Sequence, residues 1–167
     1  GYYAYKRFIN EELSDSYEYF KKFFYTAIFL PEERLRKYAI EKSLKNDPEE
    51  KNFYIEFGVY EGISTNFFSS KLKKNFYGFD SFQGFKEDWL GHAHAEGDFS
   101  LKKSWLIPKG KETPTLNDNV VLEIGWVQDT LQNFIDKNPA MKINFVHMDM
   151  DTYETSKFVL EKIKPYL

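Results

Sequence analysis

The chain has 167 residues, of which 42% are hydrophobic and 29% are charged, and it carries a net charge of −3 at pH 7. This length is sufficient to bury a core and is most simply one domain. The acidic balance argues against a nucleic-acid partner and against an anionic membrane surface, because both bind proteins that present a basic field.

Two helices are predicted ahead of the first strand. Apolar side chains recur at helical spacing over residues 15–30. Pro31 suits the first position of a second helix, which we expect to run from Pro31 to about Leu44. The sequence Asn46-Asp47-Pro48 then ends that helix, because the residue before a proline is biased away from the helical conformation.

Residues 1–50 are interpreted as an N-terminal helical segment that belongs to the same domain as the core, residues 51–167. Aromatic residues of this segment, such as Tyr17 and Phe24, could pack a homodimer.

Strands and helices alternate through the rest of the chain. We expect strands near residues 52–57, 75–80, 119–124 and 142–148, and helices near 63–72, 128–137 and 153–164. Such alternation implies right-handed crossovers and therefore an α/β, Rossmann-like, mostly parallel sheet with helices on both faces.

A long stretch between Ser81 and Asp118 carries no clear element apart from a predicted local helix near 84–90. Loops of this length inside compact domains are usually functional or mobile, and we interpret this one as a wall or lid over a ligand site. His92 and His94 lie in it and could be bases or metal ligands, although a solvated pair is the simpler reading.

No cysteine is present, which excludes disulfides and thiolate zinc sites and fits a cytoplasmic protein. No run approaches the roughly 18 apolar residues of a membrane span. The first seven residues lack the apolar core of a signal peptide. We therefore expect a cytoplasmic protein with no membrane partner.

The segment Tyr54–Ser64 is the most informative in the chain. A β-prone run ends in Glu56, and two glycines, Gly58 and Gly62, flank a short turn before the next predicted helix. The glycines permit a tight turn and close approach of a ligand. The spacing E-x-G-x-x-x-G differs from dinucleotide and triphosphate loops, and no Lys-Ser or Lys-Thr follows. The loop therefore suits an adenosine ligand without a phosphate chain.

Polar residues also follow the other predicted strands, at the edge where ligands of open α/β sheets bind. Asp80 lies 18 residues after Gly62, close to the spacing of an acid that accepts hydrogen bonds from ribose hydroxyls. Taken singly, each such residue could be a helix cap or part of the core. The remaining candidates are Gly125, Trp126, Asp129 and Thr130 after the third strand, and His147 and Asp149 at the fourth.

Asp149 and Asp151 form a D-x-D pair after an apolar strand. If the strand continued through them, the two carboxylates would converge and could bind Mg²⁺, as in nucleotide-sugar glycosyltransferases. We favour Asp149 in the site and Asp151 as the cap of the following helix. His147 by itself is most simply a core histidine.

The chain resembles the S-adenosylmethionine-dependent O-methyltransferases of the macrocin (TylF-like) family from about residue 53 to its end. The matching segments are Glu56-Phe57-Gly58 with Gly62-Ile63-Ser64, Gly78 to Phe85 with Glu87-Asp88-Trp89, Gly125 to Leu131, and Val146 to Glu154. This resemblance implies a Rossmann-like methyltransferase sheet that binds S-adenosylmethionine and methylates a hydroxyl of a small-molecule acceptor, a sugar or secondary metabolite.

The resemblance also implies roles for particular residues. Those expected to bind the cofactor are Glu56, Gly58, Tyr60, Gly62 and Ser64 on the methionine side, Asp80, Ser81 and Phe82 at the ribose and adenine, and Gly125, Trp126, Asp129 and Thr130 near the adenine edge. Asp149 would bind Mg²⁺ beside the acceptor, and Asp149 or His147 would remove the acceptor proton. The family's fold continues beyond the last predicted helix with further strands that complete the metal site, so we expect this chain to lack them.

Two alternatives remain open. A metal-dependent glycosyltransferase would use Asp149 and Asp151, but it leaves the glycine loop and Asp80 unexplained. A methyltransferase-like module without catalysis would bind a partner through exposed aromatic residues.

Overall fold

A computed structural model describes residues 2–86 and 96–167. The chain forms two compact units, Gly1–Leu35 and Arg36–Leu167.

The first unit is dominated by helix α1, Tyr2–Phe24. The predicted helix over 15–30 is correct in type but wrong in extent, because the apolar spacing continues upstream through Tyr5 and Ile9. None of its described residues is buried. Large side chains including Leu13 and Phe20 are therefore exposed along the helix.

Helix α2, Glu32–Asn46, confirms the second predicted helix to within two residues at each end. Its residue Ile40 is fully buried in the second unit. The Asn144 amide, on the last strand, donates to the carbonyl oxygen of Ser43 at 2.9 Å, and the Ser43 hydroxyl donates to the Asn144 carbonyl at 3.1 Å. These bonds fix the end of α2 against the sheet.

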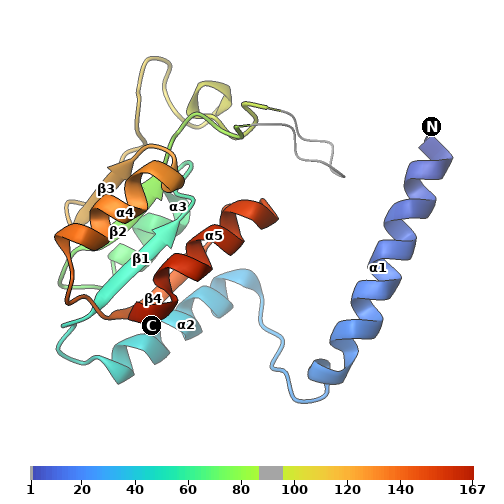
Figure 1. Ribbon diagram of the computed structural model, residues 1–167, viewed down its shortest axis with the longest axis horizontal. Helices are drawn as coiled ribbons and strands as arrows, with labels where there is room; N and C mark the ends of the chain where they lie inside the picture. Colours follow the sequence, from blue (N-terminus) through green and yellow to red (C-terminus); the bar gives the residue numbers. More distant parts are fainter. Residues whose placement is uncertain (1, 87–95) are drawn as a thin grey trace. The chain divides into compact units, whose positions relative to one another are not determined.

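The second unit is built on a four-stranded parallel sheet, as the alternating pattern predicts (Figure 1). Its strands are β1 (Phe53–Phe57), β2 (Phe76–Asp80), β3 (Val120–Ile124) and β4 (Ile143–Met148). The strand order is β3-β2-β1-β4, and all neighbouring pairs are parallel. The strand order reverses between β1 and β4, which is where doubly wound sheets bind ligands.

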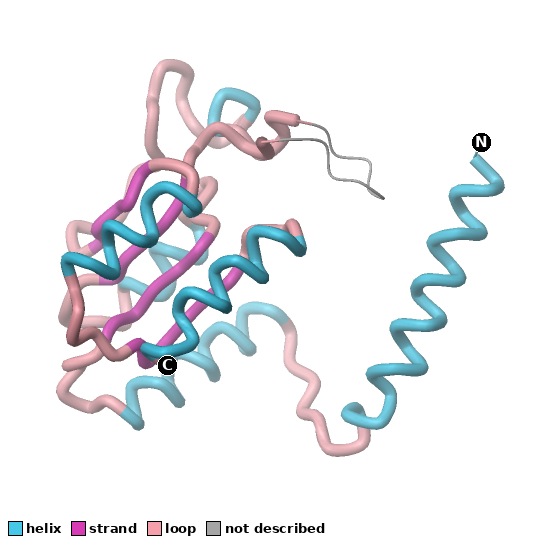
Figure 2. Tube along the Cα trace, viewed as in Figure 1, coloured by secondary structure: helices cyan, strands magenta, loops and turns pink. Residues whose placement is uncertain are grey.

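Helices cover both faces of this sheet (Figure 2). They are α2 and α3 (Ile63–Ser69) on one face and α4 (Val127–Lys137) and α5 (Tyr153–Ile163) on the other. Two short 3-10 helices, η1 (Leu101–Lys103) and η2 (Lys164–Tyr166), lie between β2 and β3 and after α5. One core cluster joins α4 and α5 to the sheet, through residues such as Leu131 and Val159. A second cluster joins α2 and α3 to it, through Ile40 and Phe68. The predicted α/β class with helices on both faces is confirmed.

Part of the long segment between β2 and β3 is described. Its described residues contain η1 and no longer helix. The predicted helix near 84–90 falls mostly outside the described residues, as do His92 and His94. No helix in the described part of the chain is long and apolar enough to cross a membrane.

Candidate functional site

The carboxyl ends of all four strands are joined to one another by backbone hydrogen bonds. These run from the Gly58 N–H to Phe79 O (2.9 Å), from the Asp149 N–H to Phe57 O (2.8 Å), and from the Gly125 N–H to Asp80 O (3.0 Å). The candidate residues predicted after separate strands are therefore assembled along one edge of the sheet.

Gly58 and Gly62 occupy left-handed backbone conformations, with φ of +92° and +79°. A Cβ on Gly58 would lie 2.1 Å from the carbonyl oxygen of Asp149, so only glycine lets the loop after β1 lie against the loop after β4. A Cβ on Gly62 would lie 2.5 Å from the Leu116 side chain. The tight turn predicted at Gly58 is present, and the space beside Gly62 is taken by the chain itself.

Asp80, the last residue of β2, binds the backbone of the loop that follows β1. One of its carboxylate oxygens accepts the N–H groups of Val59 (2.8 Å) and Tyr60 (2.7 Å), and the other accepts the N–H of Phe82 (2.7 Å). Asp80 is partly exposed. Asp80, the residue predicted to bind a ribose, thus lies against the glycine loop and already holds that loop by hydrogen bonds.

Glu56 lies at the same edge but is fully buried. One carboxylate oxygen lies 2.8 Å from Nδ1 of His147, its neighbour in the register of β1 and β4, and the other accepts the Thr65 hydroxyl. The His147 ring packs beside the Phe68 ring, with centroids 5.0 Å apart, and its side chain is 24% exposed. Glu56 therefore connects β1, β4 and α3, and its expected contact with the methionine side stays a prediction.

Asp149 and Asp151 are both exposed, and both follow the last residue of β4, Met148. Because the strand ends before them, the alternation that would make the two carboxylates converge does not apply. Asp151 is left-handed, with φ of +62°, and the N-cap position of α5 is Thr152, so the expected cap at Asp151 is wrong. No group of three or more metal-ligating side chains is found among the described residues.

The turn after β3 leads directly into α4. Trp126 is the N-cap residue of that helix, and its carbonyl oxygen accepts the N–H groups of Asp129 (2.9 Å) and Thr130 (3.1 Å). Lys86 places its ammonium 5.5 Å from the centre of the Trp126 ring. Trp126, Asp129 and Thr130 therefore lie together in the first turn of α4, beside Gly125.

The remaining predicted cofactor residues differ in exposure. Ser64 and Phe82 are buried, at 7% exposure each. The Ser81 hydroxyl accepts the N–H of Gln83 at 3.2 Å. Tyr60 is partly exposed, and its ring packs edge to face on Phe99 with centroids 5.7 Å apart.

Contacts from the long loop to this edge were not predicted. The Ser104 hydroxyl donates to the Glu61 carboxylate, beside Tyr60. Burial raises the pKa of the Tyr60 hydroxyl above its usual value, and the charge of Glu61 adds to that rise. No spacing in the sequence signals these contacts, because a loop without periodicity supplies Ser104 and Phe99. The contacts support the prediction that this loop forms a wall of the site.

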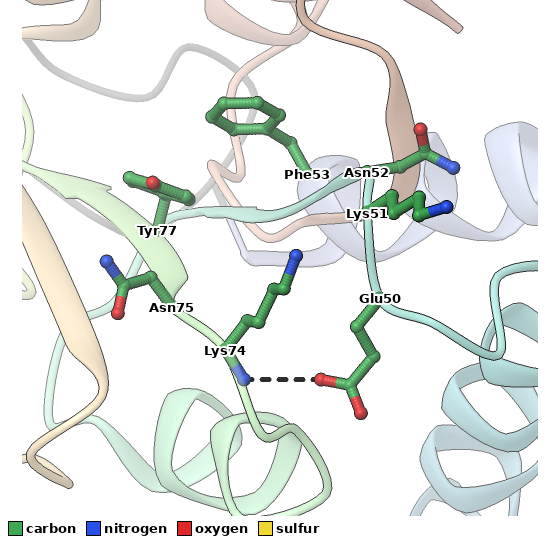
Figure 3. A pocket seen from close by; sticks show the side chains of 7 residues that line it. All are labelled: Glu50, Lys51, Asn52, Phe53, Lys74, Asn75 and Tyr77. Carbon is green, nitrogen blue, oxygen red and sulfur yellow. Dashed lines mark hydrogen bonds between the residues drawn. The ribbon is translucent and has the colours of Figure 1, made fainter.

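A pocket with a volume of about 330 Å³ opens at the opposite edge of the sheet (Figure 3). It is lined by Glu50, Lys51, Asn52, Phe53, Lys74, Asn75 and Tyr77, which precede or begin β1 and β2. The rings of Phe53 and Tyr77 stack at 5.1 Å, and Glu50 accepts the N–H groups of Lys73 and Lys74 at 2.7 and 3.2 Å. None of the predicted site residues lines this pocket.

The geometry defines a doubly wound α/β domain whose glycine loop and acidic strand ends meet where the strand order reverses. Residues 55–167 match the family model described as a methyltransferase domain. The chain therefore belongs to the methyltransferase domain family. No curated protein is significantly similar to it.

Solved structures share this fold at low sequence identity. The calicheamicin methyltransferase CalS11 is 22% identical with a TM-score of 0.62 over 95% of this chain and 66% of that one. An apo structure described as CalS11, TDP-rhamnose 3'-O-methyltransferase, is 21% identical with a TM-score of 0.52 over 95% and 65%. The O-methyltransferase NovP is 20% identical with a TM-score of 0.50 over 80% and 59%. The chain thus spans 59% to 66% of the length of these proteins.

Proposed function

We propose that this protein transfers a methyl group from S-adenosylmethionine to a hydroxyl of a small molecule. Membership of the methyltransferase domain family supports the reaction class. The observation that best supports this cofactor is the contact of Asp80 with the glycine loop, because it puts a partly exposed carboxylate beside the loop that follows β1.

The residues present fit an adenosine group without phosphates. A carboxylate accepts two hydrogen bonds at once and so matches a ribose diol. No lysine follows Gly62 at the position that would hold a triphosphate, and the acidic side chains of Glu61 and Asp80 lie at the loop, where they would repel phosphate groups. Trp126 and Phe82 would lie toward the adenine, and Gly58, Tyr60 and Ser64 toward the methionine.

Bound S-adenosylmethionine supplies an electrophilic methyl group. Transfer of that methyl group to the acceptor oxygen would require a group of this chain to accept the hydroxyl proton. We assign removal of that proton to Asp149 or His147, since both lie at the carboxyl end of β4. Most of the acceleration would come from holding the two reactants in line.

The proposed mechanism does not use Mg²⁺. Asp149 is the one ligand expected for it, and the described residues supply no cluster of three ligands. Metal dependence is instead a measurement, made by adding EDTA or Mg²⁺ to an active preparation.

A sugar hydroxyl is the acceptor class that we propose. One related structure is described as a TDP-rhamnose 3'-O-methyltransferase, although the likeness at 21% identity concerns the fold. The acceptor panel should therefore contain TDP-rhamnose, other nucleotide sugars and free phenolic or sugar hydroxyls.

Isothermal titration of the folded chain with S-adenosylmethionine and S-adenosylhomocysteine tests the cofactor. Binding of both ligands is expected, and an absence of heat at high protein concentration would contradict the proposal. Manganese-dependent binding of a nucleotide sugar without either ligand would instead favour the glycosyltransferase.

Methyl transfer is tested with labelled S-adenosylmethionine on the acceptor panel. Asp149→Asn keeps the backbone bond to Phe57 and is expected to lower turnover about 100-fold while cofactor binding persists. Cofactor binding without transfer to any acceptor would support the non-catalytic module.

We also propose that the protein is cytoplasmic. It would form a homodimer through α1. The exposed aromatic residues of α1, Tyr17 at 57%, Phe20 at 49% and Phe24 at 41%, support it. Analytical ultracentrifugation should show a dimer that Phe20→Glu dissociates, whereas Glu11→Gln on the charged face should not. A monomer at all concentrations would contradict this proposal.

A further inference from the structure

The hydrogen-bonding capacity of Asp80 is largely used by the protein itself. Its carboxylate accepts three backbone N–H groups, those of Val59, Tyr60 and Phe82, at 2.7 to 2.8 Å. An ionised carboxylate has about four acceptor positions. A ribose diol that donates both of its hydroxyls needs two of them, so it does not fit unless at least one loop N–H leaves or shares its position.

Two of the three donors are strained. Tyr60 and Phe82 have φ of +45° and +57°, in the left-handed region that residues with side chains rarely adopt. Such residues keep this conformation only where their surroundings hold it. The bonds to Asp80 hold Tyr60 in this conformation after β1 and Phe82 after β2.

The two strained residues are held to different degrees. Phe82 is 7% exposed in a cluster with Val59 and Leu101, and its carbonyl oxygen accepts the Leu101 N–H at 3.2 Å. Tyr60 packs against the same cluster and on Phe99, and its hydroxyl bonds with Ser104 and Glu61, but it is partly exposed and Phe99 is itself 39% exposed. The Tyr60 N–H is therefore the bond that costs least to release.

We propose that Asp80 is a positioning residue that holds the glycine loop when no ligand is present and gives up the Tyr60 N–H to a vicinal diol. The inference rests on the proposed function, because it takes the ligand to be a ribonucleoside. It adds a source of specificity: a ligand with two adjacent hydroxyls replaces the lost bond, and a ligand without them does not.

The bond between Asp80 and the Tyr60 N–H of the glycine loop should then depend on the ribose diol of the ligand and not on its base. Adenosine and 2′,3′-dideoxyadenosine share the base and differ in the diol, so they are matched probes. In ¹⁵N–¹H spectra of the full chain, saturating adenosine should remove the downfield shift that the charge-assisted bond gives to the Tyr60 amide proton. The Phe82 amide should keep its shift, and dideoxyadenosine should leave both shifts in place.

A variant tests the ligand-free half of the inference. Asp80→Asn preserves size but removes the charge, and it should speed hydrogen exchange at the Val59 and Tyr60 amides about tenfold. Asp136→Asn, an exposed position on α4, is the control and should leave these rates unchanged. Unchanged exchange in Asp80→Asn would overturn the proposal.

The outcomes separate this inference from the function on which it rests. If adenosine and dideoxyadenosine bind equally well and shift the Tyr60 amide alike, the exchange of partners at Asp80 is overturned and the proposed function stands. If neither adenosine nor S-adenosylhomocysteine binds the folded chain, both are overturned.

Discussion

The two edges of the parallel sheet are both organised by carboxylates that accept backbone N–H groups. At the amino edge, Asp47 accepts the N–H groups of Lys51 and Asn52, each at 2.9 Å, and the Tyr54 hydroxyl at 3.3 Å. At the carboxyl edge, Asp80 also accepts three hydrogen bonds, all of them from N–H groups. The two acids make the same number of bonds, so bond counts do not tell them apart.

Exposure does distinguish them. Asp47 and Glu50 are 5% and 7% exposed, whereas Asp80 is partly exposed. Both edges contain left-handed residues, Glu50 at the amino edge and Tyr60 and Phe82 beside Asp80. A buried acid with satisfied bonds stabilises the fold. An accessible acid that holds a strained loop can exchange partners with a ligand. The comparison therefore supports our proposal that the carboxyl edge binds the ligand, whereas the acids of the amino edge stabilise the fold.

The largest effect is expected from the contact that forms the carboxyl edge. Gly58→Ala places a methyl group against the Asp149 carbonyl at a left-handed position and should lower the free energy of unfolding by about 3 kcal/mol or more. Gly110→Ala is the control, since its φ is +89° and no atom lies within 4 Å of the added Cβ. It should cost only about 1 kcal/mol in urea denaturation. Equal losses would show that the close approach to Asp149 contributes nothing.

Alanine substitution of the two acids tests the comparison directly. Asp47→Ala leaves three donors at a buried site and should cost about 3 kcal/mol in urea denaturation. Asp80→Ala should cost only about 1 kcal/mol, because water reaches the site and Tyr60 can leave its strained conformation. Nucleoside affinity should respond in the opposite way: Asp80→Ala is expected to lower it, and Asp47→Ala is not. A larger stability loss at Asp80 would break the assignment of the two edges.

Much of this arrangement is predictable from sequence. The four strands, α4 and α5 follow from apolar runs and helical spacing, and Gly58 and Asp80 follow from their position at strand ends. The contacts that decide their roles are not predictable. Glu56 is buried because the parallel register places it beside His147, and Asp80 holds Tyr60 because that residue is left-handed. Neither register nor backbone conformation leaves a periodic signal.

The pH dependence of stability should report the amino edge. Burial alone would raise the pKa of the Asp47 carboxyl, but the bonds from Asn52, Lys51 and Tyr54 outweigh it and hold that pKa below its usual value. Because the folded pKa is the lower one, Asp47 stabilises the fold above the unfolded pKa, and this is lost as pH falls through the folded value. Urea denaturation between pH 6 and about pH 3 should show a smaller decline for Asp47→Asn than for the natural chain. Identical declines would contradict this.

Tyr54 provides the matching test at alkaline pH. Burial, followed by the charge of Asp47, raises the pKa of the Tyr54 hydroxyl to about 12, although the bond from the Asn144 amide opposes the rise. The unfolded chain loses this proton near its usual pKa of about 10, so stability should decline between about pH 10 and about pH 12. Tyr54→Phe removes this part of the decline and costs about 1 kcal/mol at neutral pH through the lost bonds to Asp47 and Asn144. Unfolding curves for both chains across this range measure it, and parallel declines would mean that Tyr54 ionises as readily folded as unfolded.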